Sequence, residues 1–301
     1  MFEFFLIFLN VVMPVFAIVL LGALLGKKLQ LEARTLTRVA YYIFVPAYVF
    51  QAISTAEVPL ASALKMISFI LLVHLAAVLI AAGLGRYLGR SREMIAAFIM
   101  IAAFGNVGNF GLAAIQFHLG DAALPFATIY YVTISTAGFA FCVGAAGWAH
   151  GGRWGALWKV LKTPAVWATV PAMIVSGSEW PVPLMLSRMV SLLAGGMIPV
   201  MLFALGLQLQ EQGKVHLSKD VLIGSTLRLG LVPALALLLA PWFALGRLEI
   251  SAGVLQAAMP GAILVAIIAK ENNIVPDFAT SVVIVSTLAS LVTLTLLMLL
   301  L

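Results

Sequence analysis

Ten long runs of apolar residues follow one another along this 301-residue chain, and only short polar connections separate them. A helix that crosses a bilayer needs about 20 consecutive, mostly apolar residues. The pattern therefore predicts an all-α polytopic membrane protein that is surrounded by lipid. The expected spans are 4–26, 35–54, 62–85, 94–117, 121–148, 160–178, 183–208, 220–245, 248–269 and 275–301.

The composition excludes a soluble globule and several functional classes. Hydrophobic residues make up 63% of the chain and charged residues 9%, against roughly 45–50% and 25% in soluble domains. The net charge of +6 does not indicate nucleic-acid binding, because the basic residues lie in short clusters between apolar runs. The single cysteine, Cys142, excludes an intrachain disulfide framework and a cysteine-based zinc site. No metal and no other cofactor is expected.

The distribution of basic residues predicts the orientation in the membrane. Most of the 17 Lys and Arg residues lie in the connections that follow odd-numbered spans. Because such loops face the cytoplasm in multi-span proteins, both termini are expected on the periplasmic side of a bacterial inner membrane. In the central connection, 149–162, Trp154 and Trp158 lie beside Lys159 and Lys162, a pattern typical of an interfacial anchor. A plain linker with chance tryptophans is the alternative.

Short sequence similarities at a nearly constant separation of 151 to 155 residues indicate an internal duplication. Five spans per half is an odd number, so the two halves must have opposite orientations, as in the inverted repeats of secondary transporters. The expected repeats are 1–148 and 163–301, joined by the cytoplasmic linker 149–162. The matching segments are 45–50 with 198–203, 105–106 with 260–261, 126–128 with 278–280, and 135–136 with 286–287.

Corresponding spans of the two halves contain residues that interrupt a helix. Gly105, Gly108 and Gly111 lie in the middle of span 94–117, and Pro260 and Gly261 lie in span 248–269. Glycine and proline are the poorest helix formers. Lipid cannot satisfy freed backbone groups, so paired breaks point to a binding site near the bilayer midplane, covered by protein or ligand. Close helix packing at the glycines is the alternative.

Broken helices at the midplane predict a site for an anion. Helix N-termini offer free N–H groups and the positive end of the helix dipole. Asn106, Asn109 and Gln256 lie at or near the breaks, where their amides can donate to a carboxylate. Tyr130 is a further candidate for substrate binding. For each of these side chains, a helix–helix hydrogen bond or core packing is the alternative interpretation.

Arg228 lies about nine residues into span 220–245, which is roughly 13 Å deep at 1.5 Å per residue. An arginine at that depth is costly and requires a partner, yet no acidic residue falls in the middle of a span. Two roles remain open. Arg228 either bonds to carbonyls at the broken helices, which we favour, or contacts the substrate directly. His74 is expected to be a packed, hydrogen-bonded residue, with proton relay as the alternative.

Other mechanisms fit the sequence less well. Cation–proton antiporters depend on membrane-embedded aspartates, and all eleven acidic residues lie near span ends or in loops. The chain contains no G-x-S-x-G or H-E-x-x-H motif and no catalytic residues are expected, so it is not predicted to be an enzyme. A channel or a sensor would use similar helices, but paired breaks in inverted repeats favour alternating access.

Several motifs resemble those of the auxin efflux carrier family, which includes plant PIN-FORMED carriers and bacterial malate and malonate permeases. The similarity covers nearly the whole chain and is strongest from span 248–269 onward. One position departs from the plant members, which have proline where this chain has Gly105; their long central cytoplasmic loop is also absent here. The similar segments are 256–260, 269–271, 276–277, 227–229 with Pro233, and Asn106 with Gly111.

The resemblance implies a crossover fold of ten helices that works by an elevator mechanism. Spans 1, 2, 6 and 7 would form a scaffold, and spans 3–5 and 8–10 a transport domain in which spans 4 and 9 cross. Family substrates are small organic anions, indole-3-acetate in plants and dicarboxylates such as malate in bacteria. The expected function is therefore secondary transport of an organic carboxylate, with a proton or sodium ion as the candidate coupling ion. A sodium-coupled symporter of related fold and a homodimeric assembly are left open.

Overall fold

The computed structural model describes residues 2–56, 58–150, 164–176, 182–211 and 215–301. Its described part is helical, and no strand occurs there. Seven helical stretches are long and apolar enough to cross a membrane. Their bounds agree with seven of the predicted spans to within a few residues: Phe2–Gly26, Ala33–Ser54, Leu60–Tyr87, Asp121–Ala149, Leu184–Glu211, Lys219–Phe243 and Pro276–Met298.

The other three predicted spans coincide with shorter helices. Span 160–178 contains α9, Pro164–Ser176, whose preceding residues lie outside the described part of the chain. Span 94–117 is divided into α6, Arg92–Ala103, and α7, Leu112–Leu119. Span 248–269 is divided into α13, Arg247–Ala257, and α14, Ile263–Glu271. The predicted breaks are therefore present, while ten membrane crossings remain a prediction. The linker 149–162, with both tryptophans, lies outside the described residues after position 150.

Three of the long stretches contain a π-helical turn two residues before a proline. These turns are Phe8–Val12 before Pro14, Ala40–Phe44 before Pro46, and Leu227–Leu231 before Pro233. Proline cannot donate a backbone hydrogen bond, and its ring clashes with the carbonyl four residues earlier. A wider turn relieves that clash and lets the helix continue. Arg228 lies within the third of these turns.

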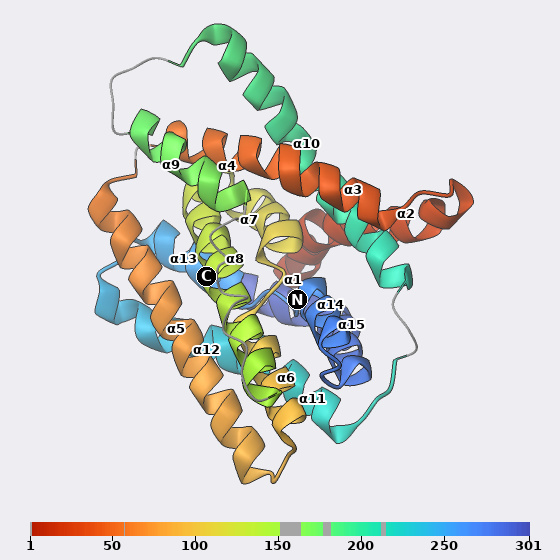
Figure 1. The fold of residues 1–301 in the computed structure, drawn as a ribbon. Helices are drawn as coiled ribbons and strands as arrows, with labels where there is room; N and C mark the ends of the chain where they lie inside the picture. The colour runs from red at the N-terminus through yellow and green to blue at the C-terminus, as the bar shows by residue number, and fades with distance from the viewer. Residues whose placement is uncertain (1, 57, 151–163, 177–181, 212–214) are drawn as a thin grey trace.

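The helices pack as two groups (Figure 1). In the first group, α10 packs along α2 and α4, and α9 packs on α4. In the second, α5, α6 and α8 pack on one another, while α15 packs on α11 and α14. The first group comprises α2 (Met13–Lys28), α3 (Ala33–Val39), α4 (Val45–Ser54), α9 and α10 (Leu184–Glu211). Helix α1 (Phe2–Ile7), which precedes α2 in the chain, packs on α15. The second comprises α5 (Leu60–Tyr87), α6, α7, α8 (Leu124–Ala149), α11 (Lys219–Thr226), α12 (Val232–Leu239), α13, α14 and α15 (Pro276–Leu300).

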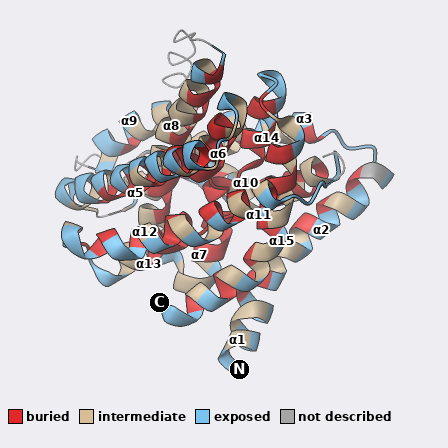
Figure 2. Cartoon of the chain, turned by 90° about the horizontal axis from the view of Figure 1, so that it is seen from below, coloured by how far each residue is buried: buried red, intermediate tan, exposed pale blue. Residues whose placement is uncertain are grey.

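The most completely buried segments are the interrupted helices. Seven residues of α13, from Ser251 to Ala257, are buried, and so is nearly all of the second half of α6. Figure 2 shows buried residues toward the middle of the molecule and exposed ones along the outer faces of helices such as α5. Many exposed residues are large and apolar, among them Leu192 and Leu79, as expected for helix faces that contact lipid.

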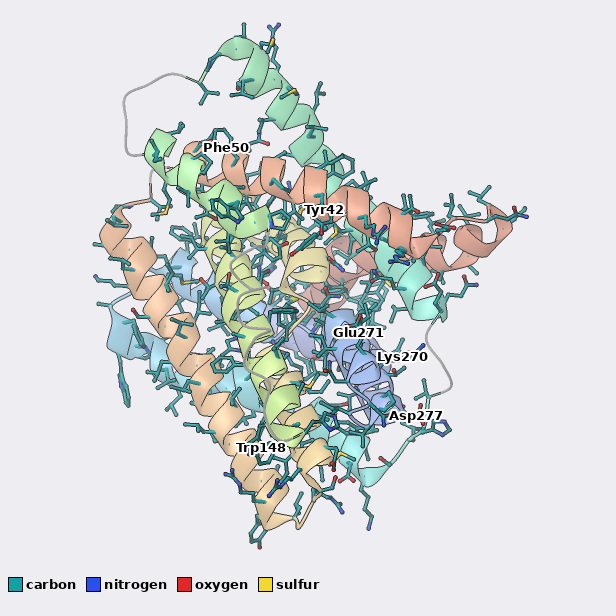
Figure 3. All side chains as sticks on the ribbon, viewed as in Figure 1. Tyr42, Phe50, Trp148, Lys270, Glu271 and Asp277 are labelled. Carbon is teal, nitrogen blue, oxygen red and sulfur yellow. The ribbon has the colours of Figure 1, made fainter. Side chains whose placement is uncertain are left out.

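Charged side chains gather at the ends of helices. Figure 3 shows Lys270 and Glu271 at the end of α14, close to Asp277 at the start of α15. Arg90, just before α6, forms an ion pair of 2.8 Å with Asp220 in the first turn of α11. This arrangement keeps charges out of the middle of the apolar stretches, where they are costly. Arg228 is the exception among the described residues.

Candidate functional site

The two helix breaks lie against each other and run antiparallel, with Gly105 paired to Gly261. The Asn106 N–H donates to the Pro260 carbonyl at 2.7 Å, and the Ala262 N–H donates to the Phe104 carbonyl at 3.1 Å. Each break therefore satisfies backbone groups of the other. We call this pair of crossing segments, residues 104–109 and 258–263, the crossover.

Arg228 donates hydrogen bonds to carbonyls at the ends of α6 and α13, where the two breaks begin. Its Nε donates to the Met259 carbonyl at 2.7 Å, Nη1 to the Ala102 carbonyl at 2.9 Å and Nη2 to the Ala257 carbonyl at 2.8 Å. The side chain is completely buried. The expectation that backbone carbonyls at the broken helices are its partners is confirmed. One guanidinium thus neutralises the partial negative charge at the C-terminal ends of both α6 and α13.

Close packing at the crossover explains two of its glycines. A Cβ atom at position 105 would collide with the guanidinium of Arg228, and one at position 108 would lie 2.6 Å from the ring of Tyr131. At Gly261, the backbone N–H donates to the hydroxyl of Ser286 in α15 at 3.1 Å. These contacts hold the crossover in one conformation without help from lipid, as the break of a membrane helix requires.

A cavity of about 370 Å³, here called the crossover cavity, opens between the two helix groups beside the crossover. The second helix group contributes residues 104–109 and 262–264 to its wall. The first segment contains the N-terminal end of the helical stretch that leads into α7, and the second contains the N-terminal end of α14. Two helix N-termini therefore lie at one cavity. None of the described residues that line it carries a charged side chain.

Asn106 and Asn109, the two asparagines predicted to bind the substrate, both line the crossover cavity. Asn106 is 5% exposed and Asn109 is partly buried. Neither side-chain amide has a hydrogen-bond partner among the described residues, and neither amide is fully enclosed by the protein. Their amides are therefore available to a molecule in the cavity.

Tyr130, predicted as a substrate-binding residue, faces away from the crossover cavity. Its side chain is completely buried, and its hydroxyl is hydrogen-bonded to His74 Nε2 at 2.8 Å. The next residue, Tyr131, lines the cavity instead. Successive residues of an α-helix are rotated by about 100° around its axis, so neighbouring positions reach different surroundings. The expectation that His74 is a packed, hydrogen-bonded residue is confirmed.

Gln256 also lies outside the crossover cavity. It is fully buried, and its Nε2 donates to the Ala127 carbonyl of α8 at 3.2 Å. Its amide oxygen, without a partner among the described residues, lies against Gly111, where a Cβ atom would collide with it. The structure therefore gives Gln256 the helix–helix hydrogen bond that was the alternative interpretation, and it explains why residue 111 is small.

The first helix group supplies polar cavity residues that the sequence did not single out. Thr37 and Tyr41 come from the stretch that leads into α4, and Gln208 comes from α10. Gln208 Nε2 donates to the Thr37 hydroxyl at 2.8 Å, and that hydroxyl donates to the Ala33 carbonyl at 2.7 Å. Their assembly depends on how α10 packs on α3, and no sequence motif connects them.

Comparisons with known proteins find membrane transporters. Residues 155–298 match the family described as membrane transport protein. A transporter of Methanothermobacter thermautotrophicus, itself uncharacterized, is 29% identical over 289 residues, 94% of this chain and 95% of the relative. The uncharacterized transporter YfdV of Escherichia coli K12 is 24% identical over 299 residues, 95% of each chain.

A plant protein matches half as much of the chain. Auxin efflux carrier component 8 of Arabidopsis thaliana is 29% identical over 141 residues, which are 45% of this chain and 38% of that protein. The family match together with these relatives confirms the resemblance that the motifs around the second break indicated. By these comparisons the chain is similar to membrane transport proteins, and the plant protein among its relatives is an auxin efflux carrier component.

Proposed function

We propose that this transporter carries small organic carboxylates across the membrane by alternating access, and that the crossover cavity binds the substrate. The observation that carries the proposal is the meeting of two helix N-termini and two unpaired asparagine amides in one cavity. Helix N-termini favour negative charge. The amides of Asn106 and Asn109 would donate to the carboxylate oxygens.

The same cavity favours substrates with a single carboxylate. A dianion would need more positive charge than two helix ends provide, each being equivalent to about half an elementary charge. No lysine, arginine or histidine is among the described lining residues. Tyr41, Tyr131 and Phe139 would surround the apolar body of the substrate.

In this proposal Arg228 holds the crossover together and does not touch the substrate. All three of its donor nitrogens already have carbonyl partners, and the side chain is fully enclosed. Its charge contributes to the electrostatic potential of the site at a distance. Gln256 and Tyr130 are likewise proposed to support the packing of the second helix group.

Alternating access is supported by the boundary between the two helix groups. Among the described residues, the long-range hydrogen bonds of 3.5 Å or shorter between two side chains each join elements of the same group. Gln208 with Thr37 lies in the first group, for example, and His74 with Tyr130 in the second. Tyr48 of α4 and Thr128 of α8 are close to each other across the boundary. Across the boundary, Phe16 of α2 packs edge-on against Phe110, with ring centroids 5.2 Å apart. Such contacts can re-form after a shift more easily than hydrogen bonds can. We propose that the second group moves against the first as an elevator.

The proposed setting is a cytoplasmic membrane with both chain ends on its outer side, and the two repeats are proposed to be inverted. The antiparallel pairing of Gly105 with Gly261 supports inverted repeats, because opposite orientation brings corresponding breaks together in this way. Under the proposed orientation, Thr37 and Gln208 lie near the cytoplasmic ends of their spans. The crossover cavity would then open toward the cytoplasm.

Uptake into proteoliposomes tests the proposal. Butyrate, succinate and butyramide have the same number of carbon atoms and differ in charge. We expect saturable uptake of butyrate that phenylacetate competes, weaker uptake of succinate, and none of the neutral amide. Equal transport of the amide would contradict the anion site. Flux that rises linearly with concentration and shows no competition would favour a channel. Repeating the assay with an imposed proton or sodium gradient identifies the coupling ion.

A further inference from the structure

A second cavity, of about 520 Å³, lies at the other end of α7 from the crossover cavity. Its wall combines Tyr48, Gln51 and Ser191 of the first helix group with Gln116 and Asp121 of the second. We call it the Asp121 cavity. It is therefore a second space that both helix groups line.

The electrostatics of the Asp121 cavity are opposite to those of the crossover cavity. Asp121 contributes a carboxylate, and none of the described lining residues is a lysine, an arginine or a histidine. Gln116 and Phe117, in the last turn of α7, also line the cavity. The C-terminal end of a helix carries the negative end of its dipole and favours cations. Carboxylate and helix end therefore both attract a positive charge.

Most of the unpaired hydrogen-bonding atoms in this cavity are acceptors that receive no hydrogen bond from the described residues. The amide nitrogen of Gln116 donates to Asp121 Oδ1 at 3.0 Å, which leaves the amide oxygen and the rest of the carboxylate free to accept. Gln51 Nε2 lies 3.5 Å from the Ser191 hydroxyl, at the limit of a hydrogen bond. A ligand with several N–H donors complements such a wall.

Tyr48 provides an independent sign of a missing ligand. The residue is 8% exposed, and its buried hydroxyl has no partner within 3.5 Å among the described residues; the side chain of Thr128 in α8 is the hydrogen-bonding group nearest to it. A buried hydroxyl without a partner is unfavourable. Tyr48 lines the Asp121 cavity, but its hydroxyl oxygen is enclosed, so a polar group bound there would satisfy it after the side chain turns toward the cavity.

The rest of the wall is apolar and indicates the size of the ligand. Ile18, Phe117, Leu124 and Ile198 contribute hydrocarbon or aromatic surface. The volume of about 520 Å³ is far larger than a bare ion or one water molecule, whose share of liquid volume is about 30 Å³. A cation with an apolar body would fill the space and use both kinds of surface.

We propose that the Asp121 cavity binds an organic ammonium cation. The ammonium group lies between the Asp121 carboxylate and the Tyr48 hydroxyl, and the apolar body packs against Phe117 and Ile198. Since α4 and α10 belong to one helix group and α7 to the other, the bound cation connects the two groups. It therefore stabilises the present arrangement and slows any movement between them.

Isothermal titration calorimetry on the detergent-purified full chain tests the proposal with 2-phenylethylammonium chloride as the probe. The neutral comparison ligand is 2-phenylethanol, which has the same body without the charge. We expect saturable binding of the ammonium and at least tenfold weaker binding of the alcohol. Asp121→Asn should weaken ammonium binding at least tenfold, and Tyr48→Phe should weaken it by a smaller factor. Glu3→Gln, which removes an exposed acid that is distant from Asp121 in the sequence, should leave binding unchanged.

Several results would overturn the assignment. These are no heat of binding for the wild-type chain, equal affinity for the ammonium and the alcohol, or unchanged affinity in Asp121→Asn with a wild-type melting temperature. If Asp121→Asn does not fold, the comparison of the two ligands on the wild-type and Tyr48→Phe proteins decides. Competition by phenylacetate would contradict a site separate from the crossover cavity. None of these outcomes depends on whether carboxylates are transported.

Discussion

The backbone of Gly105 lies directly against the guanidinium of Arg228, so that no Cβ atom fits between them. Gly105→Ala must therefore displace either the crossover or the arginine. We expect it to lower the free energy of unfolding by about 1–3 kcal/mol, the usual cost of overpacking. The melting temperature of the purified protein measures this.

Gly144→Ala in α8 is the matched control, because nothing lies within 4 Å of a Cβ atom there. Alanine is the better helix former by about 0.5–1 kcal/mol, so this variant should be at least as stable as the wild type. Equal melting temperatures for the two alanine variants would show that the close contact at residue 105 is unimportant.

Arg228→Met should destabilise the protein strongly, because three buried carbonyls lose charge-assisted hydrogen bonds worth ~1.5–3 kcal/mol each. Arg228→Lys keeps the charge but cannot reach three carbonyls with a planar fork, so we expect it to restore only part of the stability. Thermal unfolding measures both effects. Arg188→Met, the same change at an exposed arginine, is the control.

The same variants separate the two roles considered for Arg228. If Arg228 braces the crossover, that is, holds its carbonyls in place, any binding that remains in the variants should be weak for butyrate and succinate alike. If the arginine contacted the substrate, the loss would instead be larger for the dicarboxylate. Wild-type stability with a charge-dependent loss of affinity would contradict the bracing role.

Asn106→Ala should weaken carboxylate binding by about tenfold or more, because an unpaired carboxylate oxygen loses a hydrogen bond worth ~1.5–3 kcal/mol. Asn109→Ala should have a similar effect, since both residues line the crossover cavity. Titration with butyrate gives the affinities. Asn10→Ala, at an exposed position of the first span, should not change them. Unchanged affinity in a folded Asn106→Ala protein would refute the proposed site.

Single-cysteine labelling tests the orientation in a Cys142→Ala background, in which the buried native thiol is absent. With a membrane-impermeant maleimide, Arg247→Cys should react in intact cells. Lys270→Cys should react only after the membrane is permeabilised. This follows from the excess of basic residues in loops expected to face the cytoplasm. The reverse labelling pattern would place both chain ends inside.

Local chemistry was enough to predict the breaks and the partners of Arg228. Glycines and a proline interrupt a helix wherever they occur, and a buried arginine without an acidic neighbour must bond to exposed carbonyls. The direction of a side chain was not predictable in the same way. Helix α8 is apolar on all sides, so periodicity cannot tell whether Tyr130 or Tyr131 faces the cavity.

Residues that meet through packing were also missed. Thr37 and Gln208 are far apart in the chain and carry no motif, and the packing of α10 on α3 alone brings them together. The same is true of Tyr48 and Asp121. The sequence predicts Gln256 as a binding residue because it is polar and close to Pro260. One turn of helix is enough to direct its amide into α8 instead.

The position of Arg228 in the second half of the chain has a consequence for biosynthesis. The carbonyl of Ala102, which belongs to the first half, receives its hydrogen bond only after residue 228 has left the ribosome and entered the membrane. Until then the first five predicted spans must keep this carbonyl in the bilayer without the Arg228 hydrogen bond, or remain close to the insertion machinery. A chain that stops before residue 228 is consequently incomplete in both halves, and we expect cellular proteases to remove it.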